Sequence, residues 1–316
     1  MAGKTNIQWT GAFGMVWNWC LGCLRCSLGC LWCYAIQETW RKQFNPMLPN
    51  YFIPGLKKDQ TPEVQRKIVM KAKGLVAPEQ FREDNEMKWR LDWTGNSKIV
   101  LEALQEPIQN KKPTIYFVNS MSDIFLDSFE FKEIDHAFDI MERANWHVYL
   151  CLTKRADRLE AYAKSRYSNG NWPSWVWMGV TVDNQTSMKR AETLVRAKAQ
   201  AGIGTTFLSI EPQLELITGI PKGIDWCLTG GESGSHARPY DPTWAISLIK
   251  ECRSKGIAPF VKQMGEPWAK TYRLKHGKSH KHGGNPDEWP AHLRVREFPV
   301  TPWTDVQGNI KNPFNI

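Results

Sequence analysis

The sequence predicts an α/β protein built as a partial (β/α) TIM-like barrel. Beyond residue 110, short runs of β-branched or aromatic residues alternate with turn formers and amphipathic helical stretches, which is the pattern of a βα series. The length of 316 residues also suits an α/β barrel with one core. We therefore expect a barrel domain over residues 1–266 and an irregular C-terminal extension or lid over 267–316.

The expected strands are the apolar runs themselves. An early candidate lies at Asn6–Trp9, and the others are Thr114–Val118, His147–Leu152, Val176–Val180, Thr206–Ile210, Asp225–Leu228 and Pro259–Val261. The link from the run Thr206–Ile210 to the run Asp225–Leu228 is too short for a full crossover helix. Regular barrel geometry is expected to break there.

Three helices are indicated between these runs. Two show one apolar face each, made of Phe131, Ile134, Phe138 and Met141 in the first and Met188, Ala191, Val195 and Ala199 in the second. A third begins at Asp241, an N-cap residue followed by Pro242 at the first helical position, and stops before Gly256. Residues 45–95, rich in proline and charge, read as an insertion ahead of the barrel series.

Composition and charge bear on the localisation of the protein and on its binding partners. No apolar run reaches the ~18 residues that cross a bilayer, so we expect no membrane association, and the N-terminus lacks the pattern of a secretion signal, which favours a cytoplasmic protein. The net charge of +9 favours an anionic partner such as nucleic acid. A solvated basic surface without a nucleic-acid partner is the alternative.

A cysteine cluster is the richest signal in the chain. Five of the eight cysteines lie between Cys20 and Cys33, and in a reducing compartment such a cluster indicates metal or redox chemistry. Cys26, Cys30 and Cys33 are spaced C-x3-C-x2-C, and soft thiolates suit iron–sulfur clusters. The alternative is a structural zinc knuckle, in which Cys20 and Cys23 pair with Cys30 and Cys33. The other three cysteines, Cys151, Cys227 and Cys252, fall in apolar runs and are expected in the core.

Each barrel run ends in polar residues, where the loops of a (β/α) barrel converge over one mouth. The candidates for cofactor binding are Ser120, Ser122, Asp123, Thr153, Lys154, Thr181, Asp183 and Ser209. Glu211, Glu232 and Lys262 are candidate acid–base groups, because carboxylates and amines at a barrel mouth can take up or release protons. Ion pairs buried between strands are the competing explanation for these three.

The cysteine spacing, with Trp32 before Cys33, resembles the signature of radical S-adenosylmethionine (SAM) enzymes. That resemblance implies a [4Fe–4S] cluster on three thiolates, SAM on the fourth iron, a 5′-deoxyadenosyl radical that abstracts hydrogen, and an external reductant such as flavodoxin or ferredoxin. SAM needs partners for its ammonium, carboxylate, ribose and adenine, and the polar strand ends offer them. Gly230-Gly231-Glu232 is similar to a SAM-contacting segment that normally follows the second strand, so Ser120, Ser122 and Asp123 are the better candidates for the amino group.

The chain also resembles a phage-associated family of three-cysteine proteins of unknown function. The matching segments are Thr5–Thr10, Trp17-Asn18, Gly22-Cys23, Gly29-Cys30, Cys33-Tyr34-Ala35, Phe117–Asp123, Leu152–Arg155, Gly230–Gly234, Ala237-Arg238-Pro239, Lys262-Gln263 and Leu293–Pro299. Members of that family usually show C-x6-C-x2-C, which selects Cys23, Cys30 and Cys33 here. The third ligand is therefore Cys23 or Cys26, with Cys23 preferred.

This resemblance and the positive charge together favour a nucleic-acid substrate, DNA in particular, in the cytoplasm of a phage host. The specific hypothesis is isomerisation of an amino-acid adduct on thymidine in hypermodified phage DNA. A radical SAM enzyme of DNA repair or tRNA-base modification, a radical SAM enzyme for a small molecule or peptide, and a non-catalytic zinc-knuckle nucleic-acid-binding protein are the alternatives.

Overall fold

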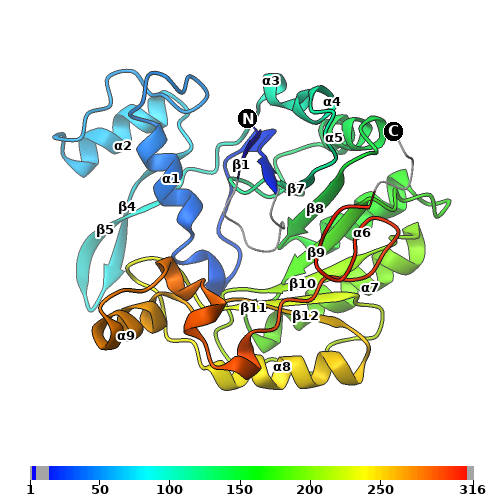
Figure 1. Cartoon of the computed structure of the whole chain (residues 1–316). Helices are drawn as coiled ribbons and strands as arrows, with labels where there is room; N and C mark the ends of the chain where they lie inside the picture. Colours follow the sequence, from blue (N-terminus) through cyan, green and yellow to red (C-terminus); the bar gives the residue numbers. More distant parts are fainter. Residues whose placement is uncertain (1, 5–13, 312–316) are drawn as a thin grey trace.

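A curled sheet of parallel strands forms a half-barrel around which the chain is organised (Figure 1). The structure is a computed structural model that describes residues 2–4 and 14–311. Within these residues the sheet order is β1-β2-β7-β8-β9-β10-β11-β12, in which β1 pairs antiparallel with β2 and the other seven strands are parallel. The strands of this sheet are β1 (Ala2–Lys4), β2 (Met15–Trp17), β7 (Ile115–Val118), β8 (Val148–Thr153), β9 (Val176–Thr181), β10 (Thr206–Ile210), β11 (Trp226–Gly230) and β12 (Ala258–Gln263).

The six strands predicted beyond residue 110 are confirmed, each within two residues at either end. The candidate at Asn6–Trp9 lies outside the described residues. The sequence prediction missed β2, whose three residues are too few for a periodic pattern and lead straight into the cysteine loop.

Helices cover the convex face of the sheet. They are α3 (Leu101–Leu104), α4 (Glu106–Gln109), α5 (Phe131–Arg143), α6 (Ala156–Arg166), α7 (Lys189–Ala201) and α8 (Pro242–Ser254), with the short 3₁₀ turn η3 (Gln185–Met188) before α7. The Asp241 side chain caps α8 by accepting from the Thr243 amide at 2.9 Å, as predicted. No helix lies between β10 and β11 in this part of the chain, so the helical layer is interrupted there while the sheet continues.

The predicted apolar face of α7 is partly wrong. Met188 and Ala191 are buried as predicted, but Val195 is only half-buried and Ala199 is exposed. The buried positions of α7 are Ala191, Thr193, Leu194, Ala197 and Ala201. Both sets fit a helical repeat, and packing against the sheet selects the one whose spacing keeps leucine inward.

The concave face of the sheet is filled by aromatic side chains. Trp177, Phe207, Trp226 and Phe260 point into it from four strands and are almost completely buried. Phe298 from the C-terminal extension packs on this group, with its ring 5.0 Å from that of Trp226. This part of the extension therefore completes the core of the half-barrel. The extension also contains α9 (Glu266–His276) and the 3₁₀ turns η4 (Lys281–Gly283), η5 (Pro286–Glu288) and η6 (Ala291–Leu293).

Residues 45–95 lie outside the main sheet (Figure 1). They contribute α2 (Pro62–Lys71) and the hairpin of β4 (Val76–Glu83) and β5 (Glu86–Trp93). The preceding cysteine segment contains β3 (Cys20–Leu21), which pairs with β6 (Lys98–Ile99), then the 3₁₀ turn η2 (Leu28–Cys30) and α1 (Tyr34–Lys42). Within the described residues, each helix is too short or too polar to span a bilayer.

Candidate functional site

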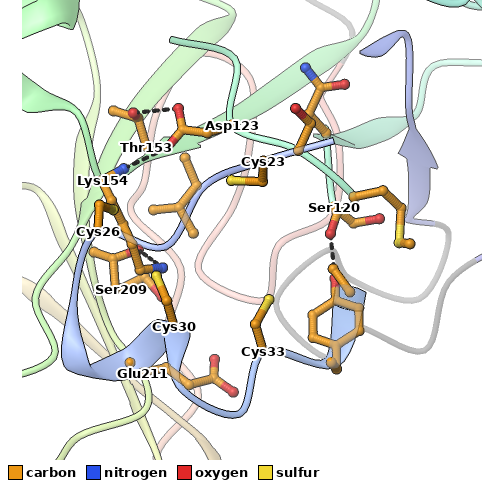
Figure 2. A pocket seen from close by; sticks show the side chains of 18 of the residues that line it. Cys23, Cys26, Cys30, Cys33, Ser120, Asp123, Thr153, Lys154, Ser209 and Glu211 are labelled. Atoms are coloured by element: carbon orange, nitrogen blue, oxygen red, sulfur yellow. Dashed lines mark hydrogen bonds between the residues drawn. The ribbon is translucent and has the colours of Figure 1, made fainter. Parts of the chain in front are cut away.

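A cavity of about 410 Å³ opens at the carboxyl ends of the parallel strands (Figure 2). Fourteen of the fifteen site residues predicted from the sequence line it: Cys23, Cys26, Cys30, Cys33, Ser120, Ser122, Asp123, Thr153, Lys154, Thr181, Ser209, Glu211, Glu232 and Lys262. They come from the cysteine loop and from the ends of β7 to β12. The half-barrel brings them together because parallel strands present their carboxyl ends at one edge.

The cysteine loop closes one side of this cavity. Cys23 follows β3, Cys30 ends η2, and Cys33 is the residue before the first turn of α1. In Figure 2, Cys23 lies on one side of the cavity, and Cys30 and Cys33 lie on the other. Cys20, by contrast, is the first residue of β3, is completely buried in the core and does not line the cavity. Cys151, Cys227 and Cys252 are buried as predicted.

Asp183 is the predicted site residue that does not line the cavity. Its carboxylate accepts from the Gly29 amide at 2.6 Å and is completely buried. Burial acts against ionisation, but hydrogen bonds from Ser27 and Gly29 and the nearby Arg190 outweigh it and lower the pKa of Asp183. Asp183 therefore ties the cysteine loop to the end of β9 instead of facing a ligand.

Gly29 permits this attachment because it has no side chain. A Cβ atom at that position would lie 2.7 Å from the Asp183 carboxylate oxygen and 3.2 Å from Pro212. Arg25 holds the other side of the loop, where its guanidinium donates to the carbonyl of Cys30 at 3.0 Å and to Asp92 of the hairpin at 2.7 Å. The loop that carries the thiols is thus attached to the barrel and to the insertion.

The thiols sit in different electrostatic surroundings. Burial raises the pKa of Cys23 to about 12 and also raises that of Cys33. A hydrogen bond from Cys26 lowers the pKa of Cys30 to about 4, with a further contribution from the Lys154 ammonium. Burial acts against the charge of Lys154, but its position beside Cys30, Cys33 and Cys26 raises the pKa of this lysine overall. Lys154 is therefore a cation directed at the thiol cluster.

Asp123 is a hub between two strand ends. Its carboxylate accepts from the Thr153 hydroxyl at 2.7 Å, the Lys154 amide at 2.9 Å and the Arg155 guanidinium at 3.1 Å. The side chains of Asp123 and Arg155 are 8% and 9% exposed, so this ion pair is shielded from water. The contacts of Asp123 connect the loop after β7 to the end of β8.

Three of the remaining predicted polar side chains already form hydrogen bonds within the protein. The Ser122 hydroxyl donates to the Gly22 carbonyl at 2.5 Å, and the Ser120 hydroxyl donates to the Asn18 side chain at 3.2 Å. Thr181 accepts from the Lys154 ammonium at 3.3 Å. Ser209 lies at the end of β10 in the cavity wall.

Both candidate acidic groups form ion pairs. Lys262 donates to Glu211 across the cavity mouth, and Arg238 binds Glu232 through two side-chain nitrogens at 2.6 and 2.9 Å. Arg238 also donates to the Leu28 carbonyl at 3.1 Å, which links the loop after β11 to the cysteine loop. Both carboxylates are therefore engaged in ion pairs, as the alternative explanation for these residues expected.

Several lining residues were not singled out as site residues from the sequence. Asn119, at the end of β7, has a positive φ of 60°, and its side-chain nitrogen is buried without a hydrogen-bond partner among the described residues. Phe117 and Leu152 form the apolar floor, which strand alternation could have indicated. Trp93 of the insertion also lines the cavity, and no local sequence pattern predicts that contact. Within residues 2–4 and 14–311, no three His, Cys, Asp or Glu side chains are placed to hold a single metal ion.

One family model matches the chain over residues 4–290, and its description is "Protein of unknown function (DUF5131)". No curated protein and no solved structure matches the chain.

Proposed function

The chain belongs to the DUF5131 family, and we propose that it is a radical SAM enzyme whose [4Fe–4S] cluster binds in the cavity at the barrel mouth. The observation that carries this proposal is the arrangement of several free thiols around a cavity that polar strand ends also line. Soft thiolates are the ligands that iron–sulfur clusters require, and cavities of roughly 300–1,000 Å³ accommodate organic cofactors. The donor set and the cavity therefore fit the proposed pair of cofactors.

We assign Cys23, Cys30 and Cys33 as the cluster ligands. Cys23 lies across the cavity from the other two, so the three thiols surround a common space (Figure 2). Cys26 is exposed and hydrogen-bonds to Cys30, which places it beside a ligand and makes it the alternative third thiolate. With three ligands one iron would stay open for SAM, and the bound pair, given an electron by an external reductant such as flavodoxin or ferredoxin, would supply reductive cleavage to a radical that abstracts hydrogen from the substrate.

The polar walls supply partners for SAM. The side-chain nitrogen of Asn119, which has no hydrogen-bond partner among the described residues, can donate to a carboxylate, and Ser209 and Thr181 offer hydroxyls. Asp123 accepts from four donors, the fourth being the Phe125 amide at 3.0 Å, so its role in the proposal is to position Thr153 and Lys154. Ser120 is left to receive the ammonium. Apolar Phe117 and Leu152 beneath these groups limit access of water to the reacting atoms.

Glu211 and Lys262 are the groups placed to handle a proton. Their ion pair lies in the cavity wall, and each side chain is 17% exposed. A substrate that separates the pair would leave an acid and a base facing the cavity. Glu232, held by Arg238 on two sides, is the less available of the two carboxylates and positions the loop over the cysteines.

Anaerobic reconstitution with iron and sulfide tests the cluster. The native chain and the variants Cys20→Ala and Cys151→Ala should show the brown four-iron chromophore, because both of those cysteines are buried away from the cavity. Cys30→Ala and Cys33→Ala should lose it, as should Cys23→Ala, whereas Cys26→Ala should retain it. A chromophore that survives Cys30→Ala and Cys33→Ala, or a native protein that takes up only zinc, would refute the proposal.

The zinc-knuckle alternative needs Cys20 and Cys23 to join Cys30 and Cys33. Cys20 is fully buried in the hydrophobic core and is absent from the cavity lining, which disfavours that set of four. Metal analysis separates the two functions, because a zinc knuckle gives colourless protein with one zinc and no sulfide.

For the substrate we propose a base in nucleic acid, with DNA favoured and an amino-acid adduct on thymidine as the specific candidate for isomerisation. The support is the net charge of +9. Reduced, reconstituted enzyme with SAM should alter the nucleosides of hypermodified DNA, measured by mass spectrometry after digestion. Deoxyadenosine release stimulated by tRNA or by damaged DNA, but not by hypermodified DNA, would reassign the substrate.

A further inference from the structure

The net positive charge of the protein is concentrated in two segments. Residues 34–75 hold eight Lys and Arg against three Asp and Glu, and residues 266–282 hold five against one. Their net charges, +5 and +4, account for the whole excess of +9, so the remainder of the chain is neutral overall. A basic surface of this kind is a local feature and not a property of the whole molecule.

Each segment begins beside the cavity. The first begins with α1, directly after Cys33, and the second is α9 with the following turn, directly after β12. The Glu266 amide at the start of α9 donates to the carbonyl of the cavity residue Glu232 at 2.9 Å. Figure 1 shows α1 with α2 and α9 on the same side of the sheet, with the cysteine loop between them.

A second cavity lies at the far end of α1. Its volume is about 560 Å³, and its wall includes Trp40, Arg41, Phe44 and Lys58. The rings of Trp40 and Phe44 are half-buried and meet edge to face, with their centroids 4.9 Å apart. Arg41 and Lys58 are exposed at the rim. Arg41 pairs with Glu38 at 2.9 Å, and both of these side chains are accessible to solvent, whereas Lys58 makes no ion pair with the described residues. Aromatic rings beside exposed cations are the elements of a nucleotide-binding pocket.

One face of α1 connects the two cavities. Tyr34 lines the first cavity and Arg41, seven positions further along the helix, lines the second. Seven residues are close to two helical turns, so both side chains leave the same face, about 10 Å apart along the axis. Tyr34 itself is 49% exposed. A chain that follows this face passes from the second cavity to the first.

We propose that the second cavity holds a nucleotide of a single-stranded polynucleotide whose neighbouring base enters the first cavity. The base stacks against Trp40 and Phe44, and Arg41 and Lys58 neutralise the adjacent phosphates. The basic segment of residues 266–282 guides the strand on the opposite side of the mouth. This inference rests on the proposed function, since it specifies the polymer that presents the substrate base.

Fluorescence anisotropy with a labelled oligothymidylate of about 15 nucleotides tests the site. The double variant Arg41→Gln with Lys58→Gln should weaken binding about tenfold near 100 mM salt and reduce the slope of log K against log salt by about 1.4, or ~0.7 per lost phosphate contact. An oligonucleotide with abasic sites should bind about fivefold more weakly or worse, as a lost stacking contact costs ~1–3 kcal/mol.

The matched control is Lys164→Gln with Lys222→Gln. It removes the same charge from exposed lysines near the amino ends of the strands, opposite the mouth, and should leave both the affinity and the slope within twofold of the native values. Equal effects of the two double variants, equal binding of abasic and base-bearing strands, or tight binding of polyglutamate instead of the oligonucleotide would overturn the site.

Iron and sulfide content is measured in the same preparations. Site-dependent binding by a protein that assembles no cluster would leave this inference standing while refuting the radical SAM proposal. If the protein assembles a cluster that cleaves SAM, but its binding of the oligonucleotide does not change when Arg41 and Lys58 are replaced, the radical SAM proposal stands and this inference is refuted.

Discussion

Replacement of Asp123 by asparagine tests whether this residue positions the site or contacts a ligand directly. The carboxylate is 8% exposed and accepts from Thr153, Lys154 and Arg155, all at 3.1 Å or less. Asparagine keeps the shape but removes the charge and turns one acceptor into a donor that faces other donors. Loss of one partner from a buried ion pair typically costs about 3–5 kcal/mol, and we expect Asp123→Asn to lower the free energy of unfolding by an amount in that range.

Urea denaturation of metal-free, reduced protein gives this free energy without a contribution from the cluster. Asp127→Asn is the matched control, because Asp127 also pairs with Arg155, at 3.4 Å, but its side chain is 72% exposed. That variant should lose less than about 1 kcal/mol. Equal stability of the two variants, together with a loss of SAM affinity in Asp123→Asn alone, would show that Asp123 binds SAM directly and that the positioning argument is wrong.

Three further predictions concern the core, the pH dependence and the cysteine loop. Phe298→Ala should lower the free energy of unfolding by about 3–5 kcal/mol, measured by urea denaturation, because the ring is 5% exposed and packs on the concave face of the sheet; a loss below about 1 kcal/mol would contradict a core role. Burial lowers the pKa of His147 from 6.5 to about 4, so the unfolded chain binds this proton more tightly and stability should fall as the pH drops from about 6.5 towards 4, by at most ~1.4 kcal/mol per unit; a His147→Gln variant with an unchanged slope of unfolding free energy against pH would refute this origin. Gly29→Ala should reduce the iron retained after reconstitution, since its Cβ would lie 2.7 Å from Asp183, whereas Gly204→Ala, whose nearest contact is 3.6 Å, should match the native protein.

The barrel strands were predictable because their signal is local. Thr206–Ile210, for example, is a short apolar run whose bounds the structure reproduces. Helix faces were less secure, as α7 shows, because Val195 and Leu194 both continue an apolar repeat and only contact with the sheet decides which turns inward. The gathering of fourteen predicted residues in one cavity follows from a single rule, that loops after parallel strands converge.

The roles of individual polar residues were not accessible in the same way. Thr181 is the last residue of β9, and Asp183 comes two positions later. Thr181 nevertheless lines the cavity, whereas Asp183 accepts a hydrogen bond from Gly29 of the cysteine loop. Glu232 and Arg238 are six residues apart, and the loop between them had to fold back before the pair could form. Trp40 and Lys58 line one pocket only because the insertion returns to the end of α1.

Apolar periodicity and residue chemistry are local properties. They were therefore enough to predict the α/β class, the order of the strands beyond residue 110 and the polar and thiol side chains at their ends. Tertiary structure decided which of those side chains are already engaged by partners, which thiol is buried in the core, and where the two basic segments meet the cavity. Those outcomes depend on contacts between residues that are distant in the chain, and such contacts are selected by packing and charge pairing in three dimensions.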